Sequence, residues 1–319
     1  MILLRKTSHD SAEYAVFVRK EAFAVAKAMV IRMIALYKKE LKSFFTTLTG
    51  WIFIAVLLLF TGIFTYAINL TQLSTQFEFV LNNISFIFLL ITPVLTMRIL
   101  SEERRAKTDQ LLFSLPLGTG KIVCAKYFAM LTVFAVPTVL MLFFPMILSL
   151  YGVVNFASAY SCIAGFFFLG AALIAVGLFI SALTESQIVA AVTSFGVLLV
   201  VYLMGSLASF VPSTAISSLI AFTVLIALVA GIVYLMTKNF FAAGIFALLA
   251  EGITVVLYYT KQTLFENAFA RVLRAVSLFD RFYSFINGVF DLTAVVYFVS
   301  VAVLFVFLTR QAVEKRRWS

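Results

Sequence analysis

Long apolar runs separated by short polar breaks make up most of the chain after residue 50. An α-helix needs about 20 apolar residues to cross a bilayer, whereas the strands of a membrane barrel alternate apolar and polar residues. The runs here are long and do not alternate, so they predict an all-α integral membrane protein. We expect about eight spans, at residues 51–70, 84–100, 122–150, 160–183, 188–210, 215–236, 240–259 and 292–308.

A different pattern precedes the first span. Lysines alternate with apolar residues that recur three or four positions apart, namely Ile34, Tyr37, Leu41, Phe44 and Leu48. This pattern is typical of an amphipathic helix that lies in the membrane interface with its lysines toward anionic head groups. We expect this helix over residues 33–49, with a turn into the first span near Gly50. Residues 1–32 form a poorly defined leader, and translation could begin at Met33 instead.

The longest polar break inside the apolar part runs from Arg98 to Lys121. Nothing between Ser101 and Phe113 breaks a helix, so we expect a helix to leave the membrane and continue to Phe113 before Pro116 turns the chain. Charged residues crowd its first half and apolar residues its second half. A solvated loop would explain the charges but not the apolar residues, whereas a protein contact explains both. Residues 101–121 are therefore predicted to dock a soluble partner.

Charge and composition fix the orientation and exclude other classes. Hydrophobic residues make up 63% of the chain and charged residues 12%, which is far from the composition of a soluble domain. All but four of the 24 lysines and arginines fall on one side of the predicted spans, and the exceptions are Lys261, Arg271, Arg274 and Arg281. The positive-inside rule therefore places both termini in the cytoplasm. The basic residues lie at membrane edges and form no patch, so no nucleic-acid partner is expected.

Four stretches resemble type-2 ABC transporter permeases, in the branch that includes gliding-motility and related export permeases. The loop SEERRAKTDQLLFSLPLGTGKIVCAKY is similar to the family's first cytoplasmic loop, which has the pattern EE-(K/R)-R-x-G-T-x-(E/D)-x-L-L-x-x-(L/R)-P-(L/I). The other stretches are MIALYKKELKSFF, GAALIAVGLFISALTESQIVAA, and LFDRFYSFINGVFDLTAVVYFVS with EKRRW, so the likeness runs from Met33 to Trp318. Ala106 with Lys107 departs from the family, which usually has a small residue or glycine before the threonine, and this affects the local loop geometry alone.

The resemblance implies a permease domain over residues 50–310 with a six-helix core, and a cytoplasmic tail over 311–319. Residues 215–260 would be an inserted helical hairpin, which either crosses the membrane or dips in and returns. Residues 264–289, whose apolar spacing is helical, would form an external re-entrant segment. A further cytoplasmic turn between spans is expected at Thr184, Glu185, Ser186 and Gln187.

The function implied is that of a permease subunit of an ABC transporter in the bacterial inner membrane, with export as the expected direction. Two copies, or one copy and a paralogue, would pair with ABC ATPase subunits that bind ATP and magnesium. The ATPase-coupling contact would then consist of Glu102, Glu103, Arg104, Arg105, Thr108, Asp109, Leu111, Leu112 and Pro116.

No catalytic, cofactor or metal site is predicted within the chain itself. His9 is the only histidine, and Gly118–Lys121 lacks both the first glycine and the Ser or Thr of a phosphate loop, so ATP must be hydrolysed by another polypeptide. Cys124 and Cys162 are expected near opposite membrane faces, too far apart for a disulfide. An intramembrane enzyme is therefore disfavoured.

Glu251 lies inside a predicted span, where a carboxylate needs a partner, a proton or water. It is a candidate translocation-path residue, but we favour a neutral carboxyl group that is hydrogen-bonded within the inserted hairpin. The alternative function, a secondary transporter or channel not driven by ATP, has Glu251 as its sole support.

Overall fold

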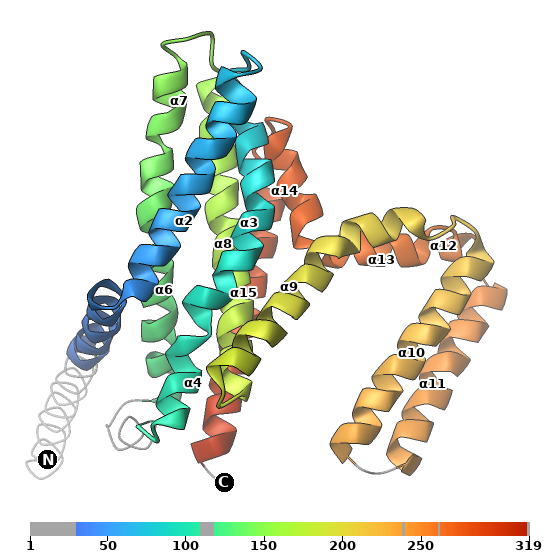
Figure 1. Ribbon diagram of the computed structural model, residues 1–319. Helices are drawn as coiled ribbons and strands as arrows, with labels where there is room; N and C mark the ends of the chain where they lie inside the picture. Colours follow the sequence, from blue (N-terminus) through green and yellow to red (C-terminus); the bar gives the residue numbers. More distant parts are fainter. Residues whose placement is uncertain (1–29, 109–117, 238–239, 261, 318–319) are drawn as a thin grey trace, which may run out of the picture. The chain divides into compact units, whose positions relative to one another are not determined.

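The computed structural model describes residues 30–108, 118–237, 240–260 and 262–317. The elements in these ranges are helices, which confirms the predicted all-α membrane protein (Figure 1). Six of the described helical segments are long and apolar enough to cross a membrane: Leu48–Leu70, Glu78–Arg105, Thr119–Leu148, Phe156–Leu183, Gln187–Phe210 and Leu292–Arg316. The crossing of residues 215–260, and with it the eight-span count, stays a prediction.

The chain divides into two compact units, of which the first comprises Met1–Gly196 and Phe285–Ser319. Residues 30–46 are helical and lead into the first candidate span. The further elements of this unit are α2 (Leu48–Phe64), the π-helix η1 (Thr65–Leu70), α3 (Glu78–Thr96), α4 (Arg98–Arg105), α6 (Thr119–Met141), α7 (Phe143–Leu148), α8 (Phe156–Leu183), the start of α9 (Gln187–Phe210) and α15 (Leu292–Arg317).

Helix α8 forms the centre of this unit and contacts α3, α4, α6 and α15. Four fully buried phenylalanines, one each from α2, α3, α6 and α8, pack together beside it: Phe53, Phe88, Phe134 and Phe166. The ring centroids of Phe88 and Phe134 are 4.7 Å apart. A side chain at Gly170 of α8 would collide with the Phe134 ring, so the missing Cβ is what admits the aromatic cluster.

The turn from helix 30–46 into α2 comes at Thr47, three residues before the predicted position. Thr47 is extended, with φ −97° and ψ 157°, and α2 begins at the next residue. A Cβ on Gly50 would lie 2.6 Å from the Phe44 carbonyl oxygen, so glycine permits the two helices to meet this closely. Gly50 itself lies inside α2, three residues after the turn.

The second unit, Val197–Ser284, spans the whole of the predicted insertion, residues 215–260. Helix α10 (Ala215–Thr237) packs along α11 (Phe240–Thr260), as expected for a hairpin. Three short helices follow, α12 (Gln262–Phe265), α13 (Ala268–Val276) and α14 (Leu278–Ile286), so the segment after the hairpin is helical, as its apolar spacing predicts. Phe222 of α10 contacts the rings of Phe265 and Phe269 and so joins α12 and α13 to the hairpin.

Candidate functional site

The charged loop begins at a joint between α3 and α4. The helical hydrogen bonding is interrupted there, and the Ser181 hydroxyl of α8 fills the gap. Its oxygen accepts from the backbone N–H groups of Leu100 (3.4 Å) and Ser101 (3.3 Å) and donates to the Met97 carbonyl (3.1 Å). Backbone polar groups inside a membrane protein must be satisfied internally, and one buried side chain does this for three of them. The joint therefore keeps the start of α4 in contact with α8.

Helix α4 ends at Arg105, so the prediction that it continues to Phe113 is wrong. The Lys107 N–H donates to the Arg104 carbonyl (3.1 Å) and the Thr108 N–H donates to the Glu103 carbonyl (3.0 Å). These two bonds, with Lys107 in the left-handed region at φ 54°, form a Schellman cap. Helix propensity along this stretch is favourable, but the cap terminates the helix in spite of it.

A buried cluster of charges, centred on Lys126 of α6, lies between α4 and helix 30–46. The Lys126 side chain is fully buried, and its ammonium group contacts Glu103 Oε1 of α4 at 2.6 Å and Glu40 Oε1 of helix 30–46 at 3.1 Å. Its third contact is the carbonyl oxygen of Ile99, at 3.2 Å. An ammonium group has three N–H donors, so Lys126 has a partner for each of them.

The cluster ties together three segments that are distant in the sequence. Helix 30–46 precedes the first span, α4 leads out of the second, and α6 leads into the third. Apolar contacts support the same junction, because Leu36 packs against Ile122 and Ala125 of α6. Removing one partner of a buried ion pair typically costs about 3–5 kcal/mol, since the other charge is left without compensation. The three segments are therefore held as one piece.

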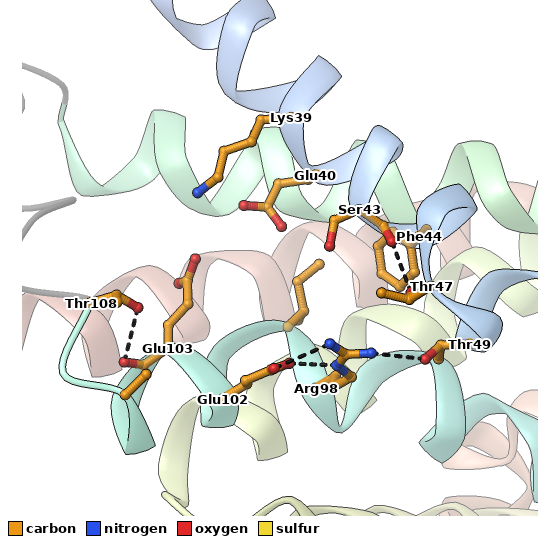
Figure 2. Close-up of a pocket in the computed structure, with 12 residues that line it drawn as sticks. Lys39, Glu40, Ser43, Phe44, Thr47, Thr49, Arg98, Glu102, Glu103 and Thr108 are labelled. Atoms are coloured by element: carbon orange, nitrogen blue, oxygen red, sulfur yellow. Dashed lines mark hydrogen bonds and ion pairs between the residues drawn. The ribbon is translucent and has the colours of Figure 1, made fainter.

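A cleft of about 290 Å³ opens beside this cluster, between helix 30–46 and α4 (Figure 2). Lys39 and Glu40 extend into it from one helix, and Glu102 and Glu103 extend from α4 (Figure 2). The Arg98 guanidinium donates to both oxygens of Glu102 and to the Thr49 hydroxyl, and so closes one end of the cleft.

The predicted coupling residues separate into two groups. Glu102 pairs with Arg98, Glu103 pairs with Lys126, and Arg104 is buried, so all three lie against the chain itself. Arg105 and Thr108 are exposed at the end of α4. The other members of the predicted contact lie outside the described residues: Asp109, Leu111, Leu112 and Pro116.

The second predicted loop, Thr184 to Gln187, lies at the same end of the first unit, since α8 carries Ser181 one turn earlier. The turn itself is Thr184 to Ser186, and Gln187 is the first residue of α9. The Glu185 carboxylate accepts a hydrogen bond from Arg316 of α15 at 2.7 Å. The turn is thus fastened to the end of the last span.

Glu251 contacts its own hairpin. Its carboxylate accepts a hydrogen bond from the Thr223 hydroxyl of α10 at 2.8 Å, which joins α10 to α11. This hydrogen bond lies within the predicted hairpin. The neutral state of the carboxyl group and the role of Glu251 in a translocation path both stay predictions.

Sequence reasoning missed Lys126, Glu40 and Ser181 as site residues. Lys126 lies within the predicted span 122–150, four residues after its start, and not in the polar break beside it. The helix before the first span buries Leu36, Glu40 and Phe44, which are spaced four apart, whereas Ile34 of the predicted apolar face is 44% exposed. The signal in the sequence was the position of Glu40, which lies on the same helix face as the apolar residues Leu36 and Phe44.

Comparison with known families gives one match. The model of the ABC-2 family transporter protein matches residues 35–247, which is more than half of the chain. Comparisons with curated proteins and with solved structures gave no match. The matched region includes helix 30–46 from residue 35, the α3–α4 joint, the Lys126 cluster and most of the hairpin. The chain therefore belongs to the ABC-2 family of transporter membrane proteins, whose members are multi-pass permease components of ABC transporters.

Proposed function

We propose that this permease works in an ATP-driven exporter of the bacterial cytoplasmic membrane, with both termini in the cytoplasm. Two copies, or one copy and a paralogue, pair with two ABC ATPase subunits, which bind ATP and magnesium. Family membership supports the transporter assignment. The single observation that supports the coupling route is the buried Lys126 cluster beneath the charged loop.

In the proposed mechanism the ATPase subunit binds the exposed end of α4 and the residues that follow it. When ATP binding closes the ATPase subunits, they displace α4. Because Lys126 holds both Glu103 and Glu40, the displacement carries helix 30–46 and α6 along with α4. Helix α6 has 23 residues and so conveys the movement into the membrane, while α4 pivots on its joint with α3.

This mechanism divides the predicted coupling residues by role. Arg105 and Thr108, which are exposed, contact the ATPase. Glu103 positions α4 on Lys126, and Glu102 positions Arg98 at the end of the cleft. Charge reversal at an exposed interface residue weakens association, whereas loss of a positioning residue leaves the contact surface in place but breaks the transmission.

The test compares Arg105→Glu with Glu103→Gln, together with the ABC ATPase encoded beside the permease gene. Arg105→Glu is expected to reduce co-purification of the ATPase. Glu103→Gln is expected to leave co-purification near the wild-type level and to reduce permease-stimulated ATP hydrolysis, because the amide is a weaker partner for Lys126. Both readouts are normalised to membrane-inserted protein.

The matched control is Arg274→Glu, a charge reversal at an exposed arginine on α13. It should leave both readouts unchanged. If Arg105→Glu has no greater effect than Arg274→Glu on co-purification, the end of α4 is not the docking contact. Equal hydrolysis by wild type and Glu103→Gln would exclude transmission through the cluster.

A further inference from the structure

An apolar groove of about 490 Å³ lies between α6, α8 and α15. These three helices contact one another in the first unit. Small residues form its floor, since Ala171 and Ala302 are almost fully buried. Phe128 and Phe307 stand at its sides and remain about half exposed. The groove is thus a trough with a small-residue floor and aromatic walls.

The interior of the groove offers almost no polar partner to a ligand. The Tyr127 hydroxyl, which lines it, already donates to the Ala171 carbonyl at 3.1 Å. A ligand with polar groups along its length would lose hydration there without replacing the lost hydrogen bonds. A hydrocarbon chain has no such cost.

The length of the groove matches one leaflet. It runs along α6 from Gly120 to Leu131 and along α15 from Val299 to Arg310. At about 1.5 Å of rise per residue each stretch is about 16 Å long, roughly half of a hydrocarbon core of about 30 Å.

One end of the groove carries a cation. Arg310 lies there, and a Cβ on Gly120 would be only 3.2 Å from its Cδ, so glycine lets the arginine stem lie across α6. Arg310 Nε is 3.4 Å from Glu314, a partly exposed pair. A guanidinium has five N–H donors, so this contact leaves others for a phosphate. Arg310 is on the side of the charged loop, because Gly120 lies at the end of that loop.

We propose that the groove binds one acyl chain of an anionic phospholipid, in the leaflet on the side of the charged loop, with the head-group phosphate at Arg310. The apolar groove accommodates the chain, its length fits one leaflet, and the arginine at the water-facing end selects the anionic head group. The bound lipid fills the space between α6 and α15 and so packs against the helix that carries Lys126.

The test uses the full-length protein in phosphatidylcholine nanodiscs that contain a trace of phosphatidylglycerol with a photoactivatable acyl chain. After irradiation, peptide mapping is expected to find the label mainly on residues 120–131 and 299–310. Unlabelled phosphatidylglycerol should compete more strongly than unlabelled phosphatidylcholine. Arg310→Gln should reduce that preference about fivefold, the effect of one cation near a membrane surface.

Two variants fill the groove, Ala302→Phe from its floor and Val303→Trp from its exposed rim, where folding is not at risk. Both should remove most of the labelling, whereas Val296→Phe, an equally exposed position on α15 outside the groove, should leave it intact. Label spread evenly over the exposed helices, or retained in Val303→Trp, would overturn the acyl-chain site. Equal competition by the two lipids, unchanged in Arg310→Gln, would overturn the head-group assignment.

Discussion

Helix α8 and the α10–α11 hairpin have similarly apolar sequences but are packed in opposite ways. Most of α8 is buried inside the chain, whereas Leu228 of α10 is 63% exposed and Leu248 of α11 is 76% exposed. The glycines show the same contrast. A Cβ at Gly177 of α8 would lie 2.5 Å from Thr96 Oγ1, while a Cβ at Gly231 of α10 would meet nothing within 4 Å.

The comparison distinguishes insertion of a helix into the membrane from packing of that helix against other helices, which hydropathy alone does not separate. An apolar sequence is enough to place a helix in a membrane, but it gives no preference between lipid and another helix, because lipid tails are as apolar as leucine. Small residues that face large partners supply that preference, since they allow the close contacts from which dispersion energy comes. Helix α8 has such residues opposite Thr96 and Phe134. A Cβ added to Gly231, Gly244 or Gly252 of the hairpin would meet no atom within 4 Å.

The largest expected effect is an all-or-none labelling result that decides whether the hairpin crosses the membrane as the core spans do. Cys124 and Cys162 are first replaced by alanine, and single cysteines are then placed at Gln72, Lys107, Lys238 and Asn267. We expect an impermeant thiol reagent on intact cells to label the cysteines placed at Gln72 and Asn267 but not those placed at Lys107 and Lys238. Labelling at Lys238 would show that the hairpin returns without crossing, and labelling at Lys107 would reverse the orientation.

A second experiment compares the charged residues of the two regions. Lys126→Met leaves Glu40 and Glu103 buried side by side and should lower the free energy of unfolding by about 3–5 kcal/mol. Glu251→Gln keeps an oxygen that accepts from Thr223 and should cost less than about 1 kcal/mol. The measurement is the unfolding midpoint in detergent. Adding Glu103→Gln to Lys126→Met should recover part of the loss, and equal shifts for Lys126→Met and Glu251→Gln would contradict the contrast.

A third experiment tests the glycines. Gly177→Ala forces α8 and α3 apart at Thr96 and should cost about 1–3 kcal/mol. Gly231→Ala has room and should be neutral or stabilise the helix by up to about 1 kcal/mol. Both are followed by the same unfolding midpoint. A loss of stability in Gly231→Ala as large as that in Gly177→Ala would mean that the hairpin is packed against something as closely as α8 is.

The smallest effect concerns the cap of α4. Lys107 occupies the left-handed position of the Schellman cap, which costs a side chain roughly 1–2 kcal/mol. Lys107→Gly should therefore stabilise the end of α4, by less than about 1 kcal/mol once the extra freedom of glycine in the unfolded chain is subtracted. Hydrogen exchange at the amides of α4 would detect it. Lys107→Ala, which removes the charge but keeps the Cβ, should give no such gain.

The sequence was sufficient for the class of fold and for the position of the charged loop, because run length and charge placement act locally along the chain. It was insufficient for the Lys126 cluster, which depends on three segments meeting in space. Lys107, which departs from the family pattern, shows where local sequence features stop being informative and the backbone geometry is needed. The family pattern marked a glycine position, but the reason, a left-handed cap that ends α4 at Arg105, follows only from the backbone hydrogen bonds.

The joint at Ser181 gives α4 a soft bending mode. In an unbroken helix each N–H is matched to one carbonyl along the axis, so a tilt stretches several bonds at once. At this joint two N–H groups share a single hydroxyl oxygen, which accepts over a wide range of directions. When the angle between α3 and α4 changes, the two hydrogen bonds to the Ser181 hydroxyl can therefore be kept in a new geometry. If α4 receives a push from an ATPase as proposed, this joint would let it rotate with little elastic resistance, while Glu103 keeps its other side paired with Lys126.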